Sequence, residues 1–123
     1  MAAPNIVNVS AIYGNTTASN LTSTSSTTIL NNPSGSNKVL KVNVLNVANY
    51  GAGAAYITIN WNNSANVAGT NFAIVGNVSV PANSTLNVID KSTQYYIEEN
   101  RSIGAIAGTA NTFIVTCSYE DLS

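Results

Sequence analysis

Apolar and polar residues alternate with a period close to two along most of this chain, whereas a helix would repeat its apolar positions every three or four residues. The clearest alternation is in 54–61, where one face would carry Ala55, Ile57, Ile59 and Trp61. β-Branched residues are frequent in such segments, as is typical of strands. We therefore expect strands at 5–13, 54–61, 72–80 and 113–120, and shorter strands at 27–31, 85–89, 95–98 and 102–107.

The other three long segments also have an apolar face, which we expect to be buried. Side chains two residues apart in a strand point to the same side of the sheet. The expected buried positions are Val7, Val9, Ala11 and Tyr13 in the first segment, Phe72, Ile74, Val78 and Val80 in the second, and Phe113, Val115, Cys117 and Tyr119 in the third.

The segment 39–49 also alternates, but its phase slips by one residue. Its apolar positions are first Leu40, Val42 and Val44, and then Leu45 and Val47. A β-bulge causes such a slip because it places two residues opposite one on the neighbouring strand. Alternatively, both faces are covered, one by the core and the other by a partner chain. The pattern favours the bulge.

Turn-forming residues separate these strands. Gly51 and Gly53 follow 39–49, and Asn, Ser and Pro are dense in 31–37 and 81–84. About eight short strands at this spacing predict an all-β fold, an antiparallel β-sandwich of the jelly-roll or immunoglobulin-like type. We expect one domain over 1–123 with a short N-terminal arm. The polar stretch 14–26 could be an extended edge, an inter-subunit arm or a mobile loop.

The composition excludes several classes of function. The chain has 123 residues, of which 20 are Asn, 14 Ser and 13 Thr, with only four Lys plus Arg, no His and one Cys. Four cations cannot neutralise a run of phosphates, so we expect no nucleic-acid partner. Without His, neither a Cys/His zinc site nor a Ser–His nucleophile can be built. We expect no cofactor and no enzymatic activity.

The ends and the hydropathy of the chain suggest a soluble protein. Residues 1–5 lack the basic and apolar regions of a signal peptide, and no apolar run approaches the roughly 18 residues of a membrane span. We therefore expect no membrane partner. The lone cysteine, Cys117, alternates with apolar residues and is expected to be a buried, inert thiol.

Seven of the nine charged residues lie between Asp90 and Asp121. We expect a solvated, ion-paired rim, with a calcium site that uses Asp90, Glu98 or Glu120 as the alternative. Glu98 and Glu99 are adjacent, so in a strand they would point to opposite faces and could not act as a catalytic pair.

Aromatic residues are the remaining candidates for binding. Tyr50, Tyr56 and Trp61 flank the glycine-rich turn, and Tyr95 begins a second aromatic pair. Exposed aromatic rings stack on sugars or anchor a protein partner. For Trp61, which lies on an apolar face, a place in the core is the simpler expectation.

Four segments carry a resemblance to a known family. They are Ala-Pro-Asn-Ile-Val-Asn-Val at 3–9, Val-Pro-Ala-Asn-Ser-Thr-Leu-Asn-Val-Ile-Asp-Lys at 80–91, Tyr-Ile-Glu-Glu-Asn-Arg-Ser-Ile at 96–103 and Val-Thr-Cys-Ser-Tyr-Glu-Asp-Leu at 115–122. With them the chain resembles small β-sandwich virion structural proteins of marine tailed phages, cyanophages especially. Asn100 stands where the family pattern would have Gly, and Asn tolerates the same left-handed conformation.

The resemblance implies a non-enzymatic virion protein, made in the bacterial cytoplasm and most concretely a decoration (cement) protein bound to the major capsid protein or other virion proteins. The alternatives are a neck, tail or fibre component, or a carbohydrate-binding module that recognises the host receptor. Natural sheet edges are usually guarded by Lys or Pro, and 5–31 contains neither. We therefore expect a homo-oligomer, a trimer or another small assembly, with an inter-subunit edge that includes Ile6, Asn8, Ser10 and Ile12.

Overall fold

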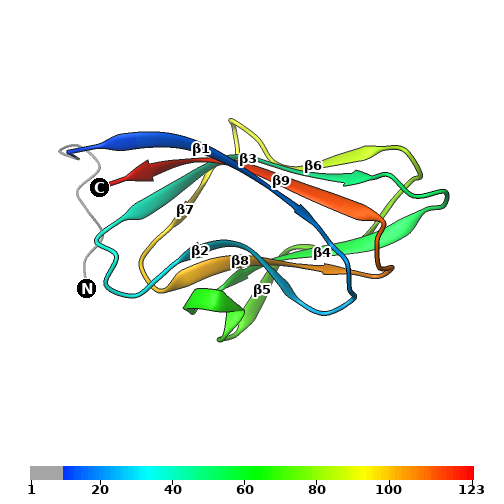
Figure 1. Cartoon of the computed structure of the whole chain (residues 1–123), viewed down its shortest axis with the longest axis horizontal. Coiled ribbons are helices and arrows are strands. Elements are labelled where there is room, and N and C mark those ends of the chain that lie inside the picture. Colours follow the sequence, from blue (N-terminus) through cyan, green and yellow to red (C-terminus); the bar gives the residue numbers. More distant parts are fainter. Residues whose placement is uncertain (1–9) are drawn as a thin grey trace.

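Residues 10–123 of the computed structural model form two antiparallel sheets packed face to face (Figure 1). The larger sheet has the order β1-β9-β3, and both β6 and β7 pair with the far side of β3; its strands are β1 (Ile12–Asn20), β9 (Phe113–Leu122), β3 (Val39–Asn49), β6 (Thr85–Ile89) and β7 (Tyr95–Ile97). The smaller sheet has four strands in the order β2 (Thr27–Asn32), β8 (Arg101–Ala107), β4 (Ala55–Asn62) and β5 (Asn71–Val80). A short 3-10 turn, η1 (Ala65–Val67), lies between β4 and β5.

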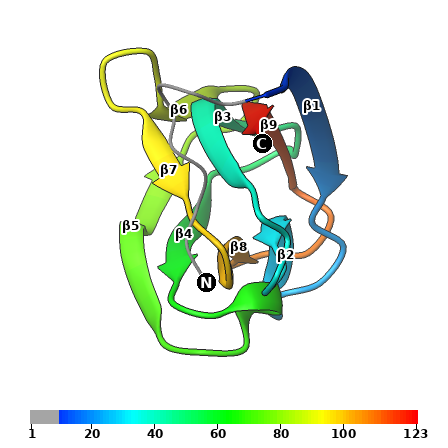
Figure 2. The same cartoon turned by 90° about the vertical axis from the view of Figure 1, so that its left-hand side faces the viewer.

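The strands pair in a nested order that defines the fold. β4 pairs with β5, β3 with β6 and β7, β2 with β8, and β1 with β9. The chain is therefore folded back on itself as one long antiparallel ribbon, and that ribbon is divided between two sheets (Figure 2). This is the jelly-roll arrangement, so the expected all-β sandwich is confirmed in its jelly-roll form.

The core lies between the sheets and is made of the inward residues of the alternating strands. Most expected positions in β4 and β9 are buried: Ala55, Ile57 and Ile59 in the first, and Phe113, Val115 and Cys117 in the second. Trp61 and Tyr119, the last expected position in each strand, are half-buried and pack against the core. Aliphatic residues from β2, β3, β7 and β8 complete it, including Leu30, Leu45, Val47, Ile97 and Ile103. Burial of these side chains is the main favourable term in folding a domain of this size.

The phase slip in β3 is a β-bulge, as expected. The register of β3 against β9 shifts between Val42 and Val44, so that Asn43 is the extra residue. Val42 and Leu45 are both fully buried. The slip comes before Val44, which lies opposite Ser118 on the outer side of the sheet instead of in the core. The expectation that Val44 shares the buried face was therefore wrong.

The start of the chain differs from the expected strand at 5–13. Within the described residues, β1 begins at Ile12 and runs to Asn20, so most of the polar stretch 14–26 is an edge strand. Tyr13 was expected to be buried, but 64% of its surface is exposed. Ala11, also expected to be buried in a strand, precedes β1 and is half-buried, and residues 5–9, with Val7 and Val9, lie outside the described residues.

The apolar face expected in β5 is also only partly buried. Val80 is buried, but Phe72 and Val78 are exposed, and Ile74 and Val75 are half-buried. β5 is the edge of its sheet, and its register against β4 shifts on both sides of Ile59. These shifts change which β5 side chains face the core, and period-two counting does not include them.

Buried asparagines close the ends of three strands. Asn49 is the last residue of β3, and only 2% of its surface is exposed. Its Nδ2 donates to the carbonyl oxygens of Gly53 (3.0 Å) and Val80 (2.8 Å), and its Oδ1 accepts from the Gly51 amide (2.8 Å). One carboxamide thus satisfies three backbone groups, and it ties the β3–β4 turn to the end of β5.

Asn62 and Asn32 act in the same way at the ends of β4 and β2. Asn62 Oδ1 accepts from the amides of Ser64 (2.9 Å) and Gly69 (2.9 Å), so it closes the β4–β5 loop. Asn32 Nδ2 donates to the carbonyl oxygens of Lys38 (3.0 Å) and Ile97 (2.9 Å). An unpaired buried polar group would cost a free energy similar to that of a lost hydrogen bond, so these side chains stabilise loops that could otherwise not be buried.

Asparagine also takes the place of glycine at positions with left-handed backbone, in loops and turns and once within β5. Of the seven described non-glycine residues with positive φ, six are Asn: Asn37, Asn66, Asn77, Asn83, Asn100 and Asn111. Asn tolerates the left-handed region better than other residues with a Cβ, because its side chain can hydrogen-bond to the local backbone. The seventh, Val67 (φ 50°), is β-branched, and its amide is held by the Ser102 hydroxyl at 2.9 Å.

We expect Asn49→Ala to lower the free energy of unfolding by about 2–4 kcal/mol, because three backbone groups lose their partner in a buried place. Asn46→Ala, on the same strand but on its half-buried outer side, should cost less than about 0.5 kcal/mol. Urea unfolding followed by Trp61 fluorescence measures both values. Equal losses for the two variants would contradict the role assigned to Asn49.

We expect Asn83→Ala to destabilise the protein by about 1 kcal/mol and Asn83→Gly to be nearly neutral, because φ at this position is +58°. Thermal melts of the two variants check this, since about 1 kcal/mol shifts the melting temperature by roughly 4 °C in a domain of this size. A larger loss for Gly than for Ala would show that the backbone angle is not what selects Asn83.

Candidate functional site: the neutral face of the larger sheet

The outer side of the larger sheet is built from small, uncharged side chains. Phe113, Val115 and Cys117 of β9 point into the core, so the residues between them point outward. Opposite residues in an antiparallel pair share a face, and the register therefore fixes the outward set. The outward set ends in the charged pair Lys41 and Glu120. We call the uncharged middle part of the set the neutral face: Thr16, Ala18, Val44, Asn46, Ala48, Thr85, Asn87, Ile114, Thr116 and Ser118.

The neutral face has ordered rows across the strands. Ala18 lies opposite Thr116, which in turn lies opposite Asn46, and Asn46 lies opposite Asn87. The strands are spaced by about 4.8 Å, so each row presents hydroxyl, methyl or amide groups at regular intervals. These groups can donate and accept hydrogen bonds without any formal charge.

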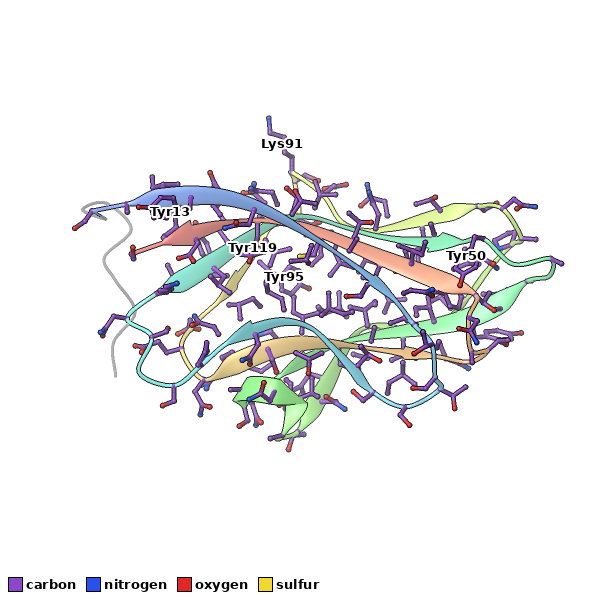
Figure 3. All side chains as sticks on the ribbon, in the orientation of Figure 1. Tyr13, Tyr50, Lys91, Tyr95 and Tyr119 are labelled. Carbon is purple, nitrogen blue, oxygen red and sulfur yellow. The ribbon has the colours of Figure 1, made fainter. Side chains whose placement is uncertain are left out.

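Two ion pairs lie at one end of this face, and Lys91 projects from the β6–β7 loop beside its middle (Figure 3). Lys41 of β3 forms an ion pair with Glu120 of β9 at 3.7 Å, and Lys38 forms one with Asp121 at 3.0 Å. The side chains of these four residues are partly exposed. The expected ion-paired rim is therefore present for Glu120 and Asp121, and it lies near the carboxyl terminus (Figure 1).

The acidic residues considered for calcium do not converge. Asp90 caps its own loop: its Oδ1 accepts from the amide (2.9 Å) and the hydroxyl (2.7 Å) of Ser92, and these hydrogen bonds lower the pKa of the carboxyl group. Glu120 is paired with Lys41, and Glu98 is exposed in the β7–β8 turn. Over residues 10–123 we find no group of three His, Cys, Asp or Glu side chains placed to hold a metal ion.

Glu98 and Glu99 lie between β7 and β8 and not in a strand, and Glu99 does not belong to the solvated rim in which it was expected. Glu98 is exposed, whereas only 7% of the surface of Glu99 is exposed. Glu99 Oε2 accepts from the Asn37 amide at 3.0 Å, which ties the β7–β8 turn to the β2–β3 loop. The buried carboxylate thus has a structural contact that the sequence pattern does not reveal.

The four candidate aromatic residues do not form one platform. Trp61 is half-buried and faces inward beside Phe72, with ring centroids 5.8 Å apart, and Arg101 Cζ lies 5.7 Å from its ring. Tyr56 points to the opposite side of β4, and 52% of its surface is exposed. Tyr50, in the β3–β4 turn, donates its hydroxyl to Asn20 Oδ1 at 2.9 Å.

The fourth, Tyr95, packs against the core from β7, far from Tyr50 (Figure 3). A single glycan chain would therefore meet at most one or two of these rings. Trp61 packs against the edge of the core, as the simpler expectation required, although it is not fully enclosed.

The expected inter-subunit edge is described only in part. Ile6 and Asn8 lie outside the described residues. Ser10 is exposed, and its amide donates to the Ser123 carbonyl oxygen at 2.6 Å. Ile12 begins β1, and 60% of its surface is exposed. The sequence predicted an inter-subunit edge at 5–13 or in the stretch 14–26, and the described edge strand, β1, runs from Ile12 to Asn20 and overlaps both ranges.

The lone cysteine is buried as expected. Cys117 lies on the inner side of β9 with no exposed surface, and burial raises the pKa of its thiol to about 12. The thiolate is the reactive form, so this sulfur is protonated and inert in the folded protein at neutral pH.

This burial makes the stability sensitive to alkali. The unfolded thiol ionises near pH 9, whereas the folded thiol stays protonated up to about pH 12, so stability is lost as pH rises between these values. Between pH 8 and 10.5 we expect the wild type to lose about 2 kcal/mol more than Cys117→Val, at about 1.4 kcal/mol per pH unit. Urea unfolding at both pH values measures the difference. Equal losses in the two proteins would contradict it.

The comparisons with known proteins leave the family open. No family model matches the chain, and no curated protein matches it. In the described residues, no helix is long and apolar enough to cross a bilayer. The described residues therefore form a jelly roll with a neutral outer face and ion pairs at one end, and any functional conclusion depends on these features and on the sequence resemblance.

Proposed function

We propose that this chain is a non-enzymatic structural protein of a phage virion, most concretely a capsid decoration protein. The observation that carries the proposal is the neutral face, a regular surface of small uncharged side chains on one side of the larger sheet. The sequence resemblance to virion proteins of marine tailed phages supports the same assignment. The jelly-roll fold occurs in both viral capsid and lectin domains. It is therefore compatible with a virion protein but does not distinguish it from a carbohydrate-binding protein.

A neutral face is suited to protein contacts in salt water. Its hydroxyl and amide groups make hydrogen bonds that salt screens little, whereas interactions between exposed charges are screened within about 8 Å at physiological ionic strength. The cores of protein interfaces are also depleted of charged residues. The small side chains of Ala18, Ala48 and Ser118 would let another protein surface approach the sheet closely.

The size of this face favours binding in many copies. Four strands spaced by about 4.8 Å and three rows spaced by about 6.8 Å cover roughly 300–400 Å². A stable interface needs about 800 Å² from each partner. One face alone would therefore bind weakly, and linked copies on a repeating lattice would gain strength by avidity. This supports a homo-oligomer that binds the major capsid protein or another virion protein.

In this proposal the protein is made in the bacterial host and ends in the virion. A neck, tail or fibre position is the nearest alternative, and it differs in copy number. A carbohydrate-binding role would have to use separate rings such as Tyr56, since the four candidate aromatic residues lie apart. We therefore do not advance it as a second function.

The test is to quantify this chain in purified virions and to bind the isolated protein to particles that lack it. We expect hundreds of copies per virion, and a particle affinity that changes less than about threefold between 0.1 and 1 M NaCl, because neutral contacts are little screened. Thr116→Lys, in the centre of the neutral face, should abolish binding, whereas Thr109→Lys, in the exposed β8–β9 turn, should not.

Three outcomes would contradict the proposal. Tens of copies or fewer would indicate a neck, tail or fibre protein, and absence from virions would reject the whole class. Binding on a glycan array that Tyr56→Ala removes, together with no binding to particles, would favour the carbohydrate-binding alternative.

A further inference from the structure

The two sheets have four edges, and three of them are guarded against pairing with another chain (Figure 2). β2 has a register shift between Thr28 and Leu30, and β5 has two shifts and a residue with positive φ, Asn77. The edge opposite β1 is divided between two short strands, β6 and β7, with a loop that carries Lys91 between them. Bulges, short strands and charges are the usual means of blocking edge pairing.

β1 has none of these guards. It is nine residues long, it pairs with β9 without a register shift, and it contains no charged residue and no proline. Such a strand presents a regular row of backbone donors and acceptors to any chain that meets it.

The hydrogen bonds at its two ends show which backbone groups of β1 point away from β9. Ala11 exchanges both backbone hydrogen bonds with Ser123, each at 3.0 Å, and the Leu21 amide donates to Phe113 at 3.0 Å. In an antiparallel pair, residues that bond to the partner alternate with residues whose N–H and C=O point away from it. The odd-numbered residues of β1 therefore bond to β9. The even-numbered ones, with Thr16 at the centre, direct their backbone groups to the free edge.

We propose that β1 pairs with β1 of a second copy of this chain, antiparallel and centred on Thr16. In this register Thr16 lies opposite its own copy, and Gly14 lies opposite Ala18 of the other chain. The inference specifies the homo-oligomer included in the proposed function, but it does not depend on a virion.

The second copy fits this edge chemically. About ten backbone hydrogen bonds would form, two for each pair of outward-directed residues. No like charges would meet, and Thr opposite Thr is a favourable cross-strand pair. Exposed Tyr13 would lie opposite Ser19 of the other chain and would lose part of its contact with water.

The pairing would also enlarge the neutral face. Opposite residues of an antiparallel pair point to the same side, so the neutral faces of both copies would lie on one surface. Its area would be roughly 600–800 Å², close to what one partner contributes to a stable interface.

The proposed pairing relates the two copies by a twofold axis that passes between their Thr16 residues. The test places like charges on this axis. Thr16→Lys brings two ammonium groups opposite each other, and we expect it to raise the dimer dissociation constant at least about tenfold. The matched control is Ser118→Lys, which adds the same charge to the same face on the neighbouring strand. There the two charges would be about 15 Å apart, beyond the screening length, so the dissociation constant should change less than about twofold.

Light scattering after size exclusion, over 1–200 µM chain, measures these constants. A mixture of Thr16→Lys and Thr16→Glu chains should restore a mixed dimer, because opposite charges then meet on the axis. A monomeric wild type would overturn the proposal, and so would equal effects of the two lysines or failure of the mixture to associate. Capsid binding by a protein that stays monomeric would overturn this pairing and leave the proposed function standing.

Discussion

Every buried backbone amide and carbonyl group needs a hydrogen-bond partner, and in this chain asparagine supplies much of what the sheets cannot. Asn32, Asn49 and Asn62 stand at the ends of three strands, where the ladder stops and the loops begin. Each turns its carboxamide toward loop carbonyl or amide groups that no other strand reaches. The rest of the sandwich depends on these contacts, because they allow the loops to lie against the ends of the core.

The same residue type explains how a protein with so few charges folds into a compact shape. Six described positions with left-handed backbone, five in loops or turns and one within β5, are occupied by Asn, so glycine, which costs more conformational entropy on folding, is needed less often. The abundance of Asn is therefore in good part structural. What remains at the surface is a neutral layer of amides and hydroxyl groups, and the neutral face is its most regular part.

The sequence predicted the sandwich, the β3 bulge and the buried faces of β4 and β9, because period-two alternation reports burial directly where a strand is central and regular. It failed at the edges. β1 has almost no apolar alternation, since its strand is held by pairing with β9 and not by burial, and β5 changes face at its register shifts. The neutral face could not be predicted from the sequence either, because it depends on which strands are neighbours in the sheet. Local patterns of apolar and polar residues do not show which distant segments pair with each other.

The nested pairing also governs when the fold can form. Among the described residues, β1 pairs only with β9, which lies far along the chain from it. On the ribosome, β1 therefore waits until β9 has been synthesised before its own ladder can close. Contacts so distant in sequence make folding slow, because the entropy of closing a long loop is lost before any contact forms. During that interval the absence of charge along β1 is a hazard as well as an advantage, since an unpaired neutral strand can join the wrong chain while its proper neighbour is still being made.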